Sequence, residues 1–275
     1  MTCYIDQMLA WRALLITAVC GGTFLAVCLV FWLGVVEQGV VARSRVESFA
    51  RRQHLAITAG NGNHVIRYLA TTRRWRATGI MLGLIGSVAW ALREGGFRID
   101  FLALFAGWFV GALVAEFRLA RVPRGPRRAA SLTRRTGSAY LPGVLWALVP
   151  AAALASLAVG GWTLVEVLRG RSVDPLAGVL CGVALAVAVT VILVQRQVLH
   201  RGQSAEAADL VAADNAIRSR SLHVLAGAGM SVIGYCVLGQ LTAMATNPDS
   251  GILLGYVAVP VLGWLVAAPQ WRVAR

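Results

Sequence analysis

The stretch LPGVLWALVPAAALASLAVGGWTLVEVL, residues 141–168, contains one charged side chain, Glu166. Because roughly 20 helical residues cross a hydrocarbon core of ~30 Å, this stretch is long enough to span a membrane. Six further apolar segments lie elsewhere in the sequence, three before this stretch and three after it. Of all seven segments, only the second, residues 77–92, is shorter than 18 residues. We therefore predict an all-α, polytopic helical membrane protein with about seven transmembrane helices, at residues 13–36, 77–92, 99–117, 141–168, 175–194, 222–244 and 251–268.

The composition of the chain excludes an ordinary soluble protein. Of its 275 residues, 58% are apolar and 14% are charged, whereas soluble domains have about 45–50% apolar and about 25% charged residues. The segments outside the predicted spans are at most 40 residues long, which is too short for an independently folded soluble domain. The whole chain, residues 1–275, is therefore predicted to be a single transmembrane domain.

The distribution of arginine predicts the orientation. All 26 basic residues are arginine; with seven spans and the N-terminus outside, 21 of them lie on the inner side and five on the outer side. Because positively charged loops stay on the cytoplasmic side, this distribution predicts N-out, C-in, with cytoplasmic loops 37–76, 118–140 and 195–221. The exclusive use of arginine indicates a GC-rich bacterial genome, so we expect a multi-pass protein of the bacterial cytoplasmic (inner) membrane.

Internal repeats suggest how the helices are organised. The second and sixth predicted helices begin alike, with Arg74-Trp75-Arg76 and Arg218-Ser219-Arg220, and at the same offset Gly83 matches Gly227. One interpretation is a lone first helix followed by three duplicated hairpins, as in many transporters and channels. The alternative is that every membrane hairpin needs arginine anchors at its cytoplasmic ends.

Glycine pairs predict close contacts between helices. Small residues four positions apart let two helix backbones approach each other in lipid. We expect these pairs to pack within one chain, and oligomerisation is the alternative use. The pairs are Gly79-x-x-x-Gly83, Gly107-x-x-x-Gly111 and Gly178-x-x-x-Gly182.

The residue patterns of common enzymes are missing from the sequence. It has no G-x-x-x-x-G-K-[ST] phosphate loop, no H-E-x-x-H pair and no cluster of cysteine and histidine, so no catalytic, cofactor-binding or metal-binding residues are predicted. The acidic residues Glu116 and Glu166 lie near the ends of their spans, where we expect them to reach the membrane surface as anchors or ion pairs. An uncharged midplane argues against a proton or sodium relay.

A weakly polar face on the sixth predicted span is the candidate ligand-lining surface. Ser231, Tyr235 and Thr242 share one helical face, while Pro150 and Pro260 remove backbone donors and leave carbonyls free to line a cavity. A ligand of this face would be apolar or amphipathic. The alternative is that the three hydroxyl groups form hydrogen bonds between helices.

The predicted cytoplasmic loops are candidate surfaces for lipids and for a partner protein. In the first of them, Val46 and Phe49 indicate an amphipathic helix before the turn at 61–63. Each arginine near an anionic leaflet contributes up to about 1 kcal/mol of attraction, so lipid headgroups are the expected partner and nucleic acid is not. The predicted anionic-lipid contacts are Arg73, Arg74, Arg76, Arg118, Arg121, Arg134 and Arg135.

The segment 204–217 predicts a further helix, with Ser204 as its N-cap and with Glu206, Asp209 and Asp214 as candidate partner-docking residues. Its Glu206-Ala207-Ala208 resembles the E-A-A loop by which ABC-importer permeases contact their ATPase, although Ala212 stands where that loop has glycine and no Leu-Pro follows. The alternative is a solvated helix whose acids offset nearby arginines.

Three functional hypotheses follow. The first is a non-enzymatic membrane subunit of a transport or export system for an apolar or amphipathic substrate, working with a cytoplasmic or membrane protein. The second is a membrane-embedded scaffold or regulatory protein without a substrate path. The third is a lipid-modifying enzyme with an unrecognised motif, which would need a polar cleft where a titratable group lies beside arginines.

Overall fold

The computed structural model describes residues 19, 21–30, 32–34, 41–93, 99–121, 128–129, 137–201, 203–204, 207–245 and 250–268. These residues are mostly helical; turns connect the helices, and β1 forms a two-residue antiparallel pair with β2. The elements in chain order are an apolar helix at Gly21–Gly34, α2 (Arg43–Gln53), α3 (Gly62–Arg93), α4 (Phe101–Arg121), β1 (Arg128–Ala129), η1 (Gly137–Ala139), α5 (Gly143–Leu168), α6 (Leu176–His200), β2 (Gln203–Ser204), α7 (Ala208–Met244) and α8 (Ser250–Ala267).

The predicted all-α class is confirmed, and the lengths and compositions of the helices agree with a membrane protein. Five of them, α3 to α7, are long and apolar enough to cross a membrane, and two shorter apolar helices lie at Gly21–Gly34 and Leu254–Ala267. Each of the seven predicted apolar segments overlaps one of these helices. The count of seven spans and the orientation stay predictions.

The chain divides into two compact units, and the division cuts through α3 and α4. One unit comprises 1–40 and 70–112, and the other comprises 41–69 and 113–275. The single transmembrane domain predicted above stays a prediction.

The first unit is held together by close backbone contact between α3 and α4. A Cβ on Gly79 would collide with the carbonyl of Gly107, and a Cβ on Gly111 would collide with the carbonyl of Trp75. Small residues are therefore needed at these positions. Two of the three predicted glycine pairs are thus packed inside the chain, whereas Gly178 and Gly182 of α6 are exposed, with open space where a Cβ would lie.

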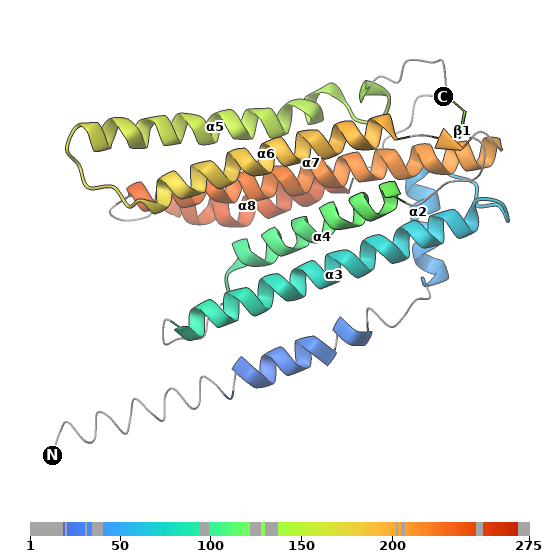
Figure 1. The fold of residues 1–275 in the computed structure, drawn as a ribbon, viewed down its shortest axis with the longest axis horizontal. Coiled ribbons are helices and arrows are strands. Elements are labelled where there is room, and N and C mark those ends of the chain that lie inside the picture. Colours follow the sequence, from blue (N-terminus) through green and yellow to red (C-terminus); the bar gives the residue numbers. More distant parts are fainter. Residues whose placement is uncertain are drawn as a thin grey trace. The chain divides into compact units, whose positions relative to one another are not determined.

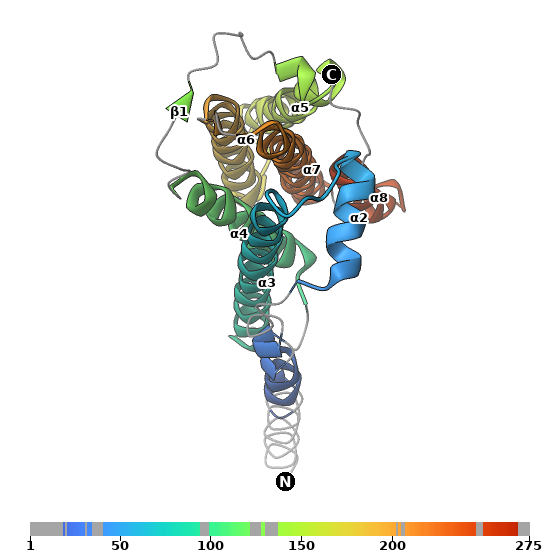
Figure 2. The same cartoon turned by 90° about the vertical axis from the view of Figure 1, so that its right-hand side faces the viewer.

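The second unit is built around α7. Helices α5, α6 and α8 all pack against it, and most of its apolar part is buried within the protein. Figures 1 and 2 show α5 to α8 running alongside one another, with α7 between α6 and α8. Helix α7 therefore forms the core of this unit. A helix buried on all sides needs no amphipathic stripe.

Helix α7 continues well beyond its apolar segment. Its 37 residues extend over about 55 Å at ~1.5 Å per residue, against a hydrocarbon core of ~30 Å. The helix predicted for 204–217 is the N-terminal part of α7, and the prediction of Ser204 as N-cap is wrong because this residue lies in β2 and the helix begins at Ala208. The residue before it, Ala207, is extended and makes no side-chain cap.

Helix α2 confirms the amphipathic pattern predicted for the first loop. Its buried residues are Val46, Phe49 and Gln53, and the Phe49 ring lies 6.1 Å from that of Tyr68. The apolar face of α2 is therefore covered by the protein itself. The hydrophobic cluster on this face comprises Val46, Phe49, Leu55, Val65, Tyr68, Leu119, Ala213, Ala216 and Ile217.

Candidate functional site

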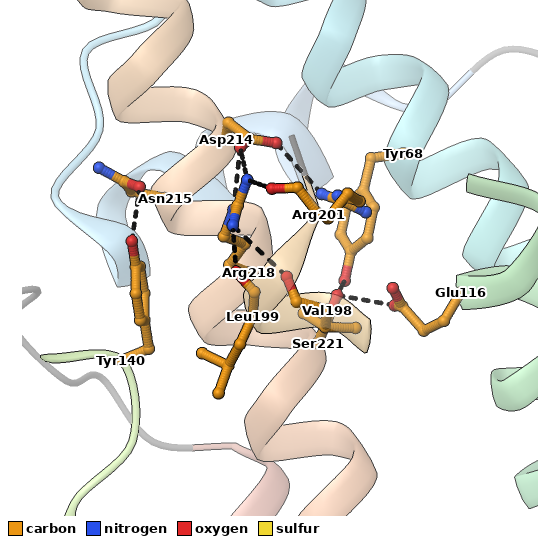
Figure 3. A network of polar contacts seen from close by, with 10 residues as sticks. All are labelled: Tyr68, Glu116, Tyr140, Val198, Leu199, Arg201, Asp214, Asn215, Arg218 and Ser221. Carbon is orange, nitrogen blue, oxygen red and sulfur yellow. Dashed lines mark hydrogen bonds and ion pairs between the residues drawn. The ribbon is translucent and has the colours of Figure 1, made fainter. Parts of the chain in front are cut away.

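The N-terminal half of α7 carries a network of buried polar side chains, which we call the α7 polar cluster (Figure 3). Its members on α7 are Asp214, Asn215, Arg218, Ser219 and Ser221, and their partners come from four other helices or helix ends. All of these residues belong to the second unit.

The centre of the cluster is an ion pair between Arg218 and Asp214. Arg218 is completely buried and Asp214 is 3% exposed. The Arg218 guanidinium donates to Asp214 Oδ2 from Nε at 2.9 Å and from Nη2 at 2.8 Å. The other carboxylate oxygen accepts a hydrogen bond from Arg201 Nη2 at 3.1 Å. Two guanidinium groups thus compensate one buried carboxylate, as burial of a charge requires.

The same arginine caps the end of α6. Arg218 Nη1 donates to the carbonyl of Leu199 at 2.9 Å, and Nη2 donates to the carbonyl of Arg201 at 2.6 Å. The last carbonyls of a helix have no partner within the helix and carry partial negative charge, so a cation there is favourable. Arg218 therefore fastens the C-terminal end of α6 to α7.

A second branch of the cluster joins α5 to α7. The Tyr140 hydroxyl, in the turn before α5, donates to Asn215 Oδ1 at 3.1 Å. Its backbone carbonyl accepts a hydrogen bond from the Ser219 hydroxyl, also at 3.1 Å. Asn215 and Ser219, one helical turn apart on α7, thereby bind the hydroxyl and the backbone carbonyl of Tyr140.

A third branch reaches α3 and α4. The Ser221 hydroxyl donates to Glu116 Oε1 at 2.7 Å and lies 3.3 Å from the Tyr68 hydroxyl. Glu116 is only 4% exposed. The expectation that this side chain reaches the membrane surface is therefore wrong, because its carboxylate turns inward to Ser221. Glu166 does form the expected ion pairs, with Arg169 at 3.1 Å and Arg171 at 2.6 Å.

The hydrogen bonds at the centre of the cluster are made to groups of the protein itself. The central arginine has its donors directed to Asp214 and to backbone carbonyls, so no face of it is presented to a ligand. The hypothesis of a lipid-modifying enzyme predicts a polar cleft where a titratable group lies beside arginines. Asp214 and its two arginines are buried and are not such a cleft.

The predicted docking acids are in three different situations. Glu206 lies outside the described residues. Asp214 is held inside the protein, which removes it from any exposed docking surface and corrects its assignment. Asp209 lies at the start of α7, where its carboxylate accepts a hydrogen bond from the Thr58 hydroxyl at 2.6 Å.

The Thr58 contact also changes the acidity of Asp209, which precedes the apolar segment 222–244. The hydrogen bond from Thr58 is the largest influence and lowers the pKa of the Asp209 carboxyl below its ordinary value, with help from the backbone N–H of Leu210. A carboxylate that accepts hydrogen bonds is favoured in its charged form.

The predicted ligand-lining hydroxyls are engaged within the chain. Ser231 donates to the carbonyl of Gly227 at 2.9 Å, Tyr235 to the carbonyl of Tyr256 at 2.9 Å, and Thr242 to the carbonyl of Leu238 at 2.8 Å. The Tyr235 bond joins α7 to α8, as the alternative of hydrogen bonds between helices expects. Pro150 and Pro260 lie inside α5 and α8.

The predicted lipid-contact arginines differ in exposure. Arg74 and Arg118 are exposed, and Arg73 and Arg76 are partly exposed. The Arg76 guanidinium lies 5.5 Å from the centre of the Trp108 ring, a cation–π contact within the first unit. The side chains of Arg121, Arg134 and Arg135 lie outside the described part of the structure.

A buried amide in the apolar part of α7 was not predicted from the sequence. Gln240 is completely buried, and its Nε2 donates to the Ser156 hydroxyl of α5 at 2.7 Å. The Ser156 carbonyl accepts a weak hydrogen bond from the Cys181 thiol of α6 at 3.6 Å. An amide inside an apolar segment is costly unless it is paired, which is the signal in the sequence that points to it.

The chain matches no family model, no curated protein and no solved structure. Within the described ranges, no group of three or more histidine, cysteine, aspartate and glutamate side chains could hold a metal ion.

Proposed function

We propose that this chain is a seven-span protein of the bacterial cytoplasmic membrane, N-out and C-in, and that it acts as a non-enzymatic membrane scaffold with its working surface in the cytoplasm. One observation carries the choice of a scaffold over a transport subunit. The hydroxyls that would line a substrate path are all bonded within the chain, on a helix enclosed by three others.

The extension of α7 supports a cytoplasmic working surface. Residues 208–221 project beyond the apolar segment and pack with α2 and the start of α3 into a cluster of their own. On this extension Ala208 and Ala212 are exposed one turn apart, and Asp209 is partly exposed beside them. These three residues belong to the described part of the predicted docking helix that a partner protein can reach.

Purification of the natively expressed, tagged protein in mild detergent tests this proposal, with mass spectrometry of stoichiometric companions. The Ala212→Arg variant adds a bulky cation to the exposed docking face, and Ala42→Arg makes the same change at another exposed alanine. A scaffold predicts a companion protein that is lost with Ala212→Arg and kept with Ala42→Arg. A companion ATPase would contradict the scaffold hypothesis and support that of a transport subunit. Purification without any companion would also contradict the proposal.

Reporter fusions test the orientation separately. Alkaline phosphatase is active only outside the cytoplasm, whereas green fluorescent protein fluoresces on the inside. The proposed orientation requires phosphatase activity at the N-terminus and fluorescence at the C-terminus. The reverse pattern would contradict it.

A further inference from the structure

Helix α2 presents two different flanks to its surroundings. On one flank, Arg43 donates to Glu47 at 2.8 Å, so its charge is compensated. Arg45 and Arg52 are seven residues apart and therefore lie on the same side of the helix, two turns apart. Both are exposed, and no described carboxylate pairs with either. Ser48 lies between them and is half-buried.

The apolar face of α2 is not available to a membrane. Val46 and Phe49 pack on Tyr68, Ala213 and Ile217 of the same unit. The helix therefore does not insert its hydrophobic residues between lipid chains, as an interfacial helix would. Its exposed surface is the polar side, which carries Arg45 and Arg52 on one flank and Arg51 beside the Arg43–Glu47 pair on the other.

The contact of α2 with α7 fixes how far α2 lies from the apolar segment. Ala213 and Ile217 precede residue 222 by five to nine residues, which is about 7–14 Å along a helix that rises ~1.5 Å per residue. Headgroups occupy about 5–7 Å on each side of the hydrocarbon core, and charges act over a Debye length of ~8–10 Å. The arginines of α2 therefore lie within electrostatic reach of lipid phosphates.

The direction of α2 agrees with this position. In Figures 1 and 2, α2 runs across the direction of α5 to α8, at the end where α7 begins. If α5 to α8 cross the membrane, α2 lies parallel to the membrane surface. One flank of α2 then faces the leaflet along its whole length, and a pair of arginines two turns apart can contact neighbouring headgroups.

We propose that Arg45, Ser48 and Arg52 form a binding site for the headgroups of anionic phospholipids in the leaflet on the α2 side. The guanidinium groups bind phosphate oxygens through paired N–H donors, and the Ser48 hydroxyl donates between them. The site anchors α2 and the α7 extension to the membrane surface. This inference rests on the proposed membrane placement of α5 to α8.

Native mass spectrometry of the full-length protein tests the site. The purified protein is titrated with phosphatidylglycerol and with phosphatidylcholine of identical acyl chains. We expect phosphatidylglycerol to bind more tightly, and we expect Arg45→Gln and Arg52→Gln each to weaken it about fivefold, as ~1 kcal/mol per arginine implies. The double variant should lose about 25-fold, with phosphatidylcholine binding unchanged.

The matched control is Arg43→Gln, which removes the same charge from the same helix on the other flank. It should leave phosphatidylglycerol binding within twofold of the unchanged protein. Equal binding by the double variant and the unchanged protein would overturn the proposal, and so would an equal loss with Arg43→Gln. A double variant that keeps the lipid but loses a companion protein would assign the flank to an acidic protein instead.

Failure of this inference can be told apart from failure of the proposed function. Lipid binding to purified protein does not depend on which side of the cell membrane α2 occupies, whereas the reporter fusions measure only that. The scaffold proposal depends on companion proteins, and Ala212→Arg leaves the α2 arginines intact.

Discussion

Arg218 and Asp214 lie one helical turn apart on α7, and Arg218 donates two hydrogen bonds to a single oxygen of Asp214, at 2.9 and 2.8 Å. The remaining donors of this arginine reach carbonyls at the end of α6. A pair with i, i+4 spacing usually stabilises its own helix by only a few tenths of a kcal/mol when exposed to solvent. This pair is buried and joins two helices, so its loss affects the packing of the whole unit.

Replacing Arg218 by methionine keeps most of the side-chain volume but leaves Asp214 with Arg201 as its remaining guanidinium partner. Because removal of one partner leaves a buried charge poorly compensated, we expect a loss of about 3–5 kcal/mol in stability. The thermal unfolding midpoint of the purified protein in detergent measures this. Arg196→Met, at an exposed position of α6, is the control and should change the midpoint little.

The triple variant Arg201→Met, Asp214→Leu and Arg218→Met removes the carboxylate together with both of its guanidinium partners. Buried ion pairs and triads are frequently replaced by apolar residues at small cost, whereas breaking one partner is expensive. We therefore expect the triple variant to unfold at a higher temperature than Arg218→Met. A triple variant no more stable than the single one would mean that the capping of α6, and not the charge balance, dominates.

Glycine substitutions on α3 separate packing from helix propensity. In Gly79→Ala, the new methyl group meets the Gly107 backbone, which cannot move as a flexible side chain can, so we expect about 1–3 kcal/mol of destabilisation. Gly86 lies on the same helix with open space around its Cβ position. Gly86→Ala should be neutral or stabilising, because alanine is the better helix former. Equal unfolding midpoints for the two variants would contradict the close contact.

The sequence was sufficient to predict the helices and part of the packing between them. Apolar runs of about 20 residues predicted them because length and lack of charge decide whether a helix can cross a membrane. The glycine pair at Gly107 and Gly111 predicted close contact for a similar reason, since only small residues allow it. The amphipathic pattern of α2 identified its buried face, although not that the protein covers it.

The α7 polar cluster could not be predicted in the same way. The spacing of Asp214 and Arg218 is equally typical of a solvated helix, and nothing local shows that α6 ends beside them. Ser221 and Glu116 are 105 residues apart, so their contact depends on how the helices pack. Gln240 is different, because an amide within an apolar segment is a local signal that a partner on another helix is needed.

The contact of Gln240 with Ser156 should be measurable as a coupling energy. Gln240→Leu removes the amide, and Ser156→Ala removes its partner without a large change in volume. Hydrogen bonds between membrane helices contribute about 0.6 kcal/mol on average and at most about 1.7, so a double-mutant cycle of unfolding free energies should give a coupling in this range. Thr190, whose hydroxyl bonds within its own helix, gives a Thr190→Ala control that should show no coupling to Gln240→Leu.

The contact between Thr58 and Asp209 should make stability depend on pH in the acidic range. The pKa of Asp209 is lowered in the folded protein, chiefly by the Thr58 hydroxyl. The stabilisation is therefore present above the unfolded pKa of about 3.9 and is lost as the pH falls through the lower, folded value. We expect the unfolding midpoint of the unchanged protein to fall more steeply below about pH 4 than that of Asp209→Asn, whose amide does not titrate. Thr58→Val keeps the carboxyl and removes the donor, so it should flatten the profile as Asp209→Asn does. A Thr58→Val profile as steep as that of the unchanged protein would show that this hydrogen bond does not set the acidity of Asp209.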